Sequence, residues 1–75
     1  MNKQRRKQIA VAIELIEQAQ AILEEVKEDE QEAFDNLPES IQLSERGELM
    51  EEYIYTLESF QYALDTGDLQ EIIDG

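Results

Sequence analysis

The side chains that could do chemistry in this sequence are almost all carboxylates. Aspartate and glutamate together account for 19 residues, and pairs such as Glu14 with Glu17 and Glu48 with Glu52 have the spacing of neighbours on a helix. Paired carboxyl groups can act as general acid and base, and carboxylates from facing helices can hold metal ions. On solvated helix faces the same pairs are ordinary surface charge, so their spacing alone indicates no reaction.

The sequence lacks the residue types that would complete such a site. It contains no histidine and no cysteine. Its serine and threonine hydroxyl groups therefore lack the histidine base that usually activates such a nucleophile. Those hydroxyl groups belong to Ser40, Ser44, Thr56, Ser59 and Thr66. Bundle metal sites also use Glu-x-x-His pairs, and residues 28–32 lack the glycine of a calcium loop. We therefore expect a non-enzymatic protein with no catalytic residue, no metal ion and no cofactor.

The charge is strongly acidic and unevenly placed. The formal net charge is −13, and four of the six basic residues lie in the first seven positions. These four are Lys3, Arg5, Arg6 and Lys7. Such a surface repels nucleic acid and anionic membranes, whereas it attracts basic protein surfaces. We therefore expect a basic protein as partner, and no direct binding to nucleic acid or membrane.

Neither a targeting signal nor a membrane span is visible. The basic start is followed by an amphipathic pattern rather than by a signal-peptide core, because Glu14 interrupts the apolar run from Ile9 to Ile16. No apolar run approaches the roughly 20 residues that a spanning helix needs. The expectation is a soluble, intracellular protein.

Apolar spacing predicts an all-α fold with one domain, residues 1–75. A helix covers about residues 3–35, a connector 36–43, a second helix about 45–65 and a short turn 69–73. The two long helices would form an antiparallel hairpin. In the first helix the expected seam consists of Ile9, Ile16 and Leu23, seven residues apart, and of Ala12, Ala19, Val26 and Ala33 between them.

The connector contains residues that commonly begin or end helices. Asn36 with Glu39 resembles a capping box, and Pro38 fits the first turn of a short helical segment. Ser44 offers an N-cap for the second long helix. Gly47 is expected to allow close packing against an alanine of the first helix.

The second helix has a seam of its own, and apolar side chains are left over. Its seam consists of Leu43, Met50, Leu57 and Leu64 with Gly47, Ile54 and Gln61 at the alternate positions. The apolar residues outside both seams include Ile13, Leu15, Ile22, Leu49, Tyr53, Tyr55, Phe60 and Tyr62. Two helices cannot bury all of these, and a chain of this length buries only about 60% of its unfolded surface. We therefore expect a homodimer that forms a four-helix bundle, with a higher oligomer or an obligate partner protein as the alternatives.

Acidic side chains form stripes on both helices. On the first helix they are Glu14, Glu17, Glu24 and Glu28, and on the second they are Glu51, Glu58 and Asp65. Carboxylates four residues apart on a helix are separated by about 6 Å along its axis, near the spacing of successive phosphates on a nucleic-acid strand. These stripes would imitate nucleic acid to a basic groove, or they would only keep the surface soluble.

Three stretches of the sequence resemble a known group of proteins. Residues 4–9, 34–40 and 44–48 read QRRKQI, FDNLPES and SERGE. They resemble small, acidic, uncharacterised proteins encoded by phages and prophages of Gram-positive bacteria. The resemblance covers residues 3–52 and carries no known activity. It implies a phage-like origin and the cytoplasm of a bacterial host, a setting in which short acidic helical proteins are often inhibitors.

Three functions are compatible with the sequence. The leading hypothesis is an inhibitor that places its acidic stripes in the basic groove of a host nucleic-acid-handling or defence protein. The first alternative is a structural or assembly module that docks a helical partner through Leu49, Tyr53, Tyr55, Phe60 and Tyr62. The second alternative is an oligomer that binds a phosphorylated small ligand through Arg5, Arg6 and Arg46.

Overall fold

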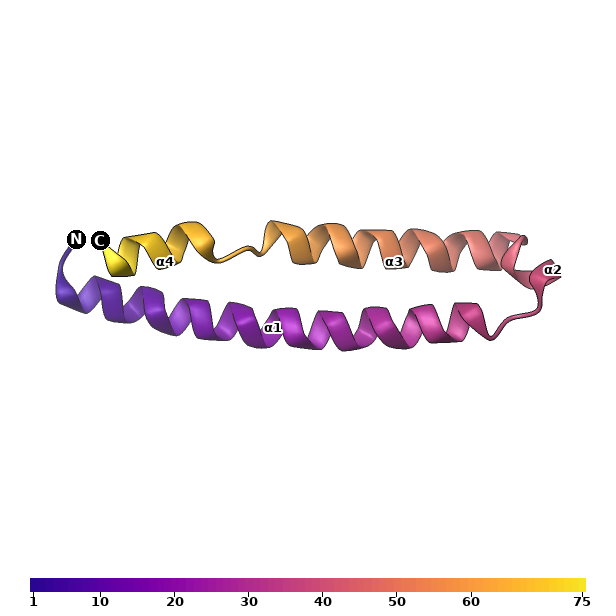
Figure 1. Ribbon diagram of the computed structural model, residues 1–75, viewed down its shortest axis with the longest axis horizontal. Coiled ribbons are helices and arrows are strands. Elements are labelled where there is room, and N and C mark those ends of the chain that lie inside the picture. Colours follow the sequence, from indigo (N-terminus) through magenta and orange to yellow (C-terminus); the bar gives the residue numbers. More distant parts are fainter.

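The computed structural model describes residues 1–75 and contains helices but no strand. Its elements in chain order are α1 (Lys3–Asp35), α2 (Glu39–Gln42), α3 (Glu45–Ala63) and α4 (Gly67–Asp74). The first helix runs the length of the molecule, α2 turns the chain at one end, and α3 and α4 return alongside α1 (Figure 1). Both termini therefore lie at the same end of a rod with extents of 58 × 14 × 13 Å. The prediction of an all-α protein is confirmed.

Two asparagines set the ends of α1. The side chain of Asn2 accepts a hydrogen bond of 2.8 Å from the backbone N–H of Arg5, which satisfies one free donor of the first turn. Asn36 was expected to be the N-cap of a short helical turn that starts at Leu37, but it is the C-cap of α1, and its N–H donates back into the last turn. The helix α2 instead begins at Glu39, directly after Pro38. Pro38 is the N-cap of α2, where a missing N–H breaks no helical hydrogen bond, and its carbonyl accepts from the N–H groups of Ile41 and Gln42.

The corner between α2 and α3 depends on Ser44 and Gly47. Ser44 stands at the N-cap of α3 as predicted, but its hydroxyl donates to the carbonyl of Ile41 instead of capping the helix. Gly47 is one of two buried residues, and a Cβ there would overlap the backbone carbonyl of Gln42. The close approach predicted at Gly47 is real, but the neighbour is this corner of the backbone rather than an alanine of α1.

On α3 the seam that faces α1 matches the predicted one except at its first residue. The residues that are buried or half-buried are Gly47, Met50, Ile54, Leu57, Gln61 and Leu64. Leu43 is exposed, because it ends α2 at the corner and lies beyond the contact between the long helices.

On α1 four of the seven predicted seam residues are wrong. Ile9, Ile16 and Leu23 are half-buried as expected, but the residues between them that face the seam are Ile13, Gln20, Lys27 and Phe34. The predicted Ala12, Ala19, Val26 and Ala33 are exposed. The two sets are neighbours in sequence and lie about 100° apart around the helix. Burial of Ile13 and Phe34 removes more apolar surface from water than burial of alanines would, which favours the observed side.

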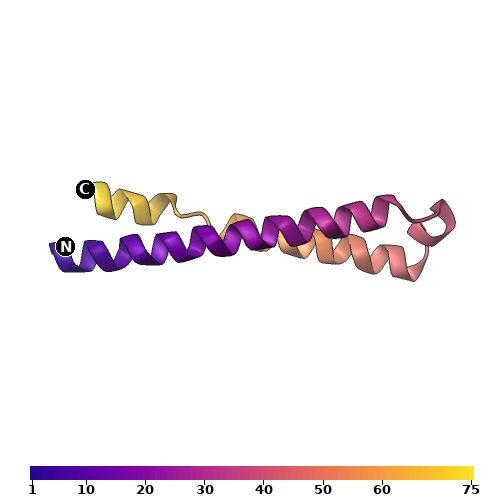
Figure 2. The ribbon, with the colours of Figure 1, turned by 90° about the horizontal axis from the view of Figure 1, so that it is seen from below.

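The C-terminal part of the chain forms a longer helix than predicted. A turn was expected over residues 69–73, whereas α4 has eight residues, Gly67–Asp74. It continues the return path along the N-terminal half of α1, with Leu69 and Ile73 half-buried. In Figure 2, α3 and α4 lie on opposite sides of α1, so the returning helices cross it at a small angle.

The chain by itself has almost no enclosed core. Ile13, at 5% exposure, is the one buried hydrophobic residue, and the remaining seam residues are half-buried. None of the helices combines the length and the apolar character that crossing a membrane requires.

Candidate functional site

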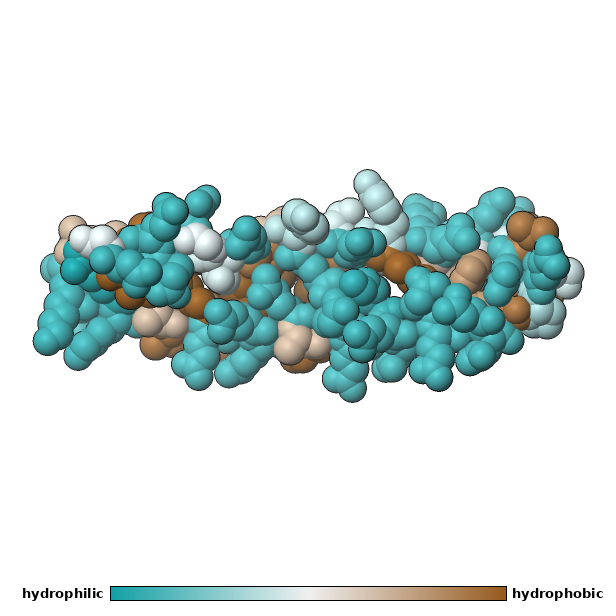
Figure 3. All heavy atoms as spheres, viewed as in Figure 1, coloured by the Kyte–Doolittle hydropathy of each residue, from teal (hydrophilic) through white to brown (hydrophobic).

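The seam divides the surface of the rod into two long sides. The side seen in Figure 3 is hydrophilic over most of its area, and apolar atoms show mainly along the line between α1 and the returning helices. On α1, Val26 and Glu28 are two residues apart and therefore point to nearly opposite directions. Each lines a different groove, Val26 with Tyr53 and Glu28 with Glu58. The predicted acidic residues and the exposed apolar side chains thus occupy opposite sides of the same seam, although Glu30 lines the groove of Val26 and Tyr53.

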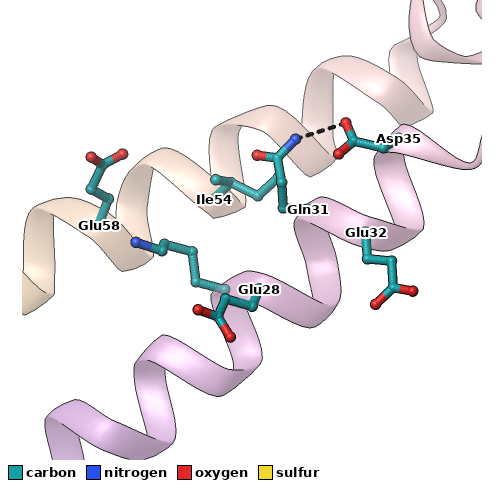
Figure 4. A pocket seen from close by; sticks show the side chains of 7 residues that line it. Glu28, Gln31, Glu32, Asp35, Ile54 and Glu58 are labelled. Atoms are coloured by element: carbon teal, nitrogen blue, oxygen red, sulfur yellow. Dashed lines mark hydrogen bonds between the residues drawn. The ribbon is translucent and has the colours of Figure 1, made fainter.

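The predicted acidic residues of both helices share one side, which we call the acidic face. By helical spacing its members are Glu14, Glu17, Glu24, Glu28, Glu32, Asp35, Glu51, Glu58 and Asp65. Toward its corner end is an open groove of about 390 Å³ lined by Lys27, Glu28, Gln31, Glu32 and Asp35 of α1 and by Ile54 and Glu58 of α3. The carboxylates of Glu28 and Glu58 point away from each other, out of this groove (Figure 4). The side-chain amide of Gln31 donates to Asp35 at 3.0 Å within this groove. No group of three or more carboxylates is arranged to hold a metal ion.

A polar layer crosses the seam beside this groove. The amide of Gln61 on α3 donates to the carboxylate of Glu24 on α1 at 2.8 Å, and Lys27 Nζ lies 3.1 Å from the same oxygen. Gln20 in turn donates to the backbone carbonyl of Leu64 at 2.7 Å. The pairing of Lys27 with Glu24 is the only ion pair in the structure.

Glu24 differs electrostatically from the other carboxylates. The hydrogen bond from Gln61 and then the contact with Lys27 lower the pKa of Glu24 below its ordinary value of 4.5, because both neighbours favour the charged form. Its side chain is nearly half exposed, so solvent screens these contacts. Glu24 thus links Gln61 of α3 to Lys27 of α1 within the polar layer.

Two tyrosines stand on the acidic side of the seam. Tyr62 and Asp65 line a smaller hollow with Gln20 and Gln61. The rings of Tyr55 and Tyr62 are 71% and 85% exposed, so neither is packed against this chain. Of the five predicted apolar contact residues, these two accompany the carboxylates.

The other predicted contact residues lie on the opposite side, which we call the apolar face. By helical spacing its large members are Val11, Leu15, Ile22 and Val26 of α1, Leu49, Tyr53 and Phe60 of α3, and Ile72 of α4. All eight are exposed, and Val26, Tyr53 and Thr56 line an open groove of about 300 Å³. The structure therefore brings Leu49, Tyr53 and Phe60 together and separates them from Tyr55 and Tyr62.

The predicted anion-binding arginines are far apart within one chain. Arg5 and Arg6 are in the first turns of α1 at the end that holds both termini, whereas Arg46 is in the first turn of α3 at the corner end. Arg6 Nε is buried without a hydrogen-bond partner. A single chain does not assemble these three side chains into one site.

Sequence reasoning missed the polar layer. Gln61 was placed in the seam, but Gln20 and Lys27 were not, because the seam of α1 was read one residue too early. The signal was available in the repeat of Ile13, Gln20, Lys27 and Phe34 every seven residues.

Comparisons with known proteins add no relative. No protein-family model matches the chain, and searches of curated proteins and of solved structures found no similar protein.

Proposed function

We propose that this protein is a non-enzymatic inhibitor that binds a basic nucleic-acid-handling or defence protein of a bacterial host through its acidic face. The observation that carries this proposal is the groove that Glu28 of α1 and Glu58 of α3 both line (Figure 4). Carboxylates from two helices thereby belong to one continuous surface rather than to two unrelated stripes.

The physical basis is the match between this surface and a groove built for nucleic acid. Basic grooves attract rows of negative charge over distances of about 10 Å at moderate salt. Carboxylates one helical turn apart have nearly the spacing of phosphates along a strand. Each helix supplies one row, and Gln61 joins the two rows through Glu24. The proposed complex forms rapidly and weakens as salt rises.

The resemblance of residues 3–52 to phage and prophage proteins supports the narrower form of the proposal, an inhibitor acting inside a bacterial cell.

The pairing of two chains belongs to the same proposal. We propose that α1 and the returning helices act as a hairpin, of which two copies form a four-helix bundle. The support is the thin core, since one chain encloses only Ile13 and Gly47.

Charge reversal tests the acidic face directly. Proteins captured from a bacterial lysate by the wild type are identified, and the affinity of each for Glu51→Lys with Glu58→Lys is measured. We expect a basic partner that double-stranded DNA or RNA displaces and that the double variant no longer binds. The matched control is Glu48→Lys with Glu52→Lys, which changes the net charge equally but lies on the side of α3 that points away from α1.

The outcomes show whether binding depends on the net charge of the protein or on where its carboxylates lie. Loss of binding in Glu51→Lys with Glu58→Lys but not in the control supports recognition by the acidic face. Equal loss in both would mean that only net charge matters, and equal retention in both would show that the acidic face does not bind the target.

The tyrosines carry a second candidate function, the docking of a helical partner in an assembly. Exposed rings at Tyr55 and Tyr62 are unusual on a surface this rich in charge, and aromatic side chains are common anchors of interfaces. In that case binding survives high salt and depends on the rings rather than on the carboxylates.

A further inference from the structure

The largest feature without a role so far is the apolar face. Ile22 is 61% exposed, Leu15 60% and Phe60 57%, although all three are large apolar residues on regular helices. Nothing else in the chain covers them. A contiguous apolar surface of this extent marks an interaction site in a soluble protein.

The apolar face has the periodicity of a second helix-packing seam. On α1 it repeats at spacings of three and four through Ala12, Leu15, Ala19, Ile22 and Val26. On α3 the same spacing runs through Leu49, Tyr53, Thr56, Phe60 and Ala63. Such spacing is what a helix uses to pack along another helix. The two stripes flank one groove, because Val26 and Tyr53 both line it.

The size of this face fits a stable dimer. With extents of 58 × 14 Å, one side of the rod offers an area of roughly 800 Å², which is the amount that one partner contributes to a standard interface. A straight rod of the same length would cover the whole face, and a second copy of this chain is such a rod.

The charges favour a second copy in antiparallel orientation. The terminal half, residues 1–20 with 64–75, has four basic and six acidic side chains, whereas the corner half, residues 21–63, has two basic and thirteen acidic ones. Parallel pairing would place the two corner halves side by side. Antiparallel pairing instead sets the basic segment Lys3–Lys7 of each chain beside the carboxylates of the other corner half, which lowers the repulsion.

We infer that the apolar face is the interface with a second copy of this chain, packed antiparallel to form a four-helix bundle. The two-fold axis passes between Ala19 and Ile22, so that the small residue of one chain lies opposite the large residue of the other. Leu15 of each chain then meets Val26 of the other. Both acidic faces point outward, on opposite sides of the dimer.

This inference deepens the proposed pairing of two chains and does not depend on the target of the acidic face. It adds which surface pairs and in which direction. One consequence is that each dimer offers two acidic faces and can hold two target molecules.

The first test is the mass in solution by light scattering at about 150 mM salt, near physiological ionic strength. The wild type is expected at twice the chain mass of 8.7 kDa. Ile22→Glu, on the apolar face, is expected to shift the mass to that of one chain or to unfold the protein. The matched control Ala21→Glu, on the acidic side of the same helix turn, is expected to remain a dimer with unchanged helicity.

The outcomes test two claims separately, that two chains pair and that they pair through the apolar face. A monomeric wild type overturns the pairing of two chains altogether. A dimer that tolerates Ile22→Glu but not Ala21→Glu overturns the apolar face as its interface while pairing stands. A dimer that tolerates both substitutions overturns it as well.

The second test addresses direction and uses the absence of native cysteine. Leu15→Cys and Val26→Cys are prepared separately, mixed, allowed to exchange and oxidised under mild conditions. Antiparallel packing predicts a disulfide between the two different variants and little between identical ones, because residues 15 of the two chains are then about 16 Å apart along the axis. A disulfide between two Leu15→Cys chains, or none in the mixture, overturns the antiparallel arrangement.

Discussion

The side-chain amide of Gln20 donates a hydrogen bond of 2.7 Å to the backbone carbonyl of Leu64, which is 44 residues further along the chain. Leu64 is the C-cap of α3, where backbone carbonyls have lost their helical partners. Gln61 makes a contact in the opposite direction, donating to the backbone carbonyl of Gln20 at 3.4 Å. These two hydrogen bonds hold the break between α3 and α4 next to Gln20 of α1.

Replacing Gln20 should therefore weaken the fold measurably. We expect Gln20→Ala to lower the free energy of unfolding by about 1 kcal/mol, because the Leu64 carbonyl loses its donor in a half-buried position. Urea unfolding followed by circular dichroism measures the change. The control is Gln18→Ala on the exposed side of the same helix, and equal stability of the two variants would contradict the role assigned to Gln20.

The lowered pKa of Glu24 predicts how its contribution varies with pH. A carboxyl group whose pKa is lower in the folded protein stabilises the fold fully above its ordinary value of 4.5, and this stabilisation is lost as the pH falls through the lowered value. The stability advantage of the wild type over Glu24→Gln should thus be present at neutral pH and vanish in acid.

Urea unfolding of both proteins at a series of pH values measures this difference. The comparison with Glu24→Gln isolates one group from the relief of repulsion among the other carboxylates. Glu25→Gln removes the same charge from an exposed neighbour without touching the contact with Gln61. An advantage over Glu24→Gln that persists in acid would show that the contacts with Gln61 and Lys27 do not favour the charged form.

Adding a single methyl group at Gly47 should destabilise the fold. The Cβ of alanine would overlap the backbone carbonyl of Gln42, so the corner has to shift. We expect Gly47→Ala to lower the free energy of unfolding by about 1–3 kcal/mol, despite the better helix propensity of alanine. The midpoint of thermal unfolding, measured by circular dichroism, reports the change.

Gly67→Ala is the matched control for this experiment. Its nearest neighbour is Oδ1 of Asp65 at 3.3 Å from the added Cβ, which accepts a hydrogen bond of 2.9 Å from the Gly67 N–H and needs to shift by only a few tenths of an ångström. Gly67→Ala should therefore leave stability unchanged or raise it slightly. Equal loss in the two variants would mean that the overlap at Gly47 is not the cause.

The tyrosines of the acidic side allow the two candidate functions to be separated. If the carboxylates dominate recognition, Tyr55→Ala with Tyr62→Ala should weaken target binding by less than about tenfold, or 1.4 kcal/mol. Stability should not change, since both rings are largely exposed. Titration calorimetry with the captured target measures the affinity, and complete loss of binding would instead favour docking through the aromatic rings.

The amino-acid sequence by itself determined the elements of this protein and the polarity of its surface. Two long helices follow from apolar spacing, and the seam of α3 from Met50 to Leu64 was predictable because one repeat fits it clearly better than its neighbours. Pro38 and Ser44, which are typical of helix starts, located the corner to within a few residues. These features depend on contacts between residues close in sequence, which local spacing describes well.

Only the tertiary structure decided which way α1 turns toward α3. The repeat of Ile9, Ile16 and Leu23 is compatible with either Ala12 or Ile13 as its companion, and the choice depends on the surface of the other helix. That rotation places Gln20 in the seam, opposite Leu64 and Gln61. It also gathers the carboxylates of both helices on one side and leaves the alanine stripe uncovered on the other, because burying one face of a helix decides what its remaining faces expose.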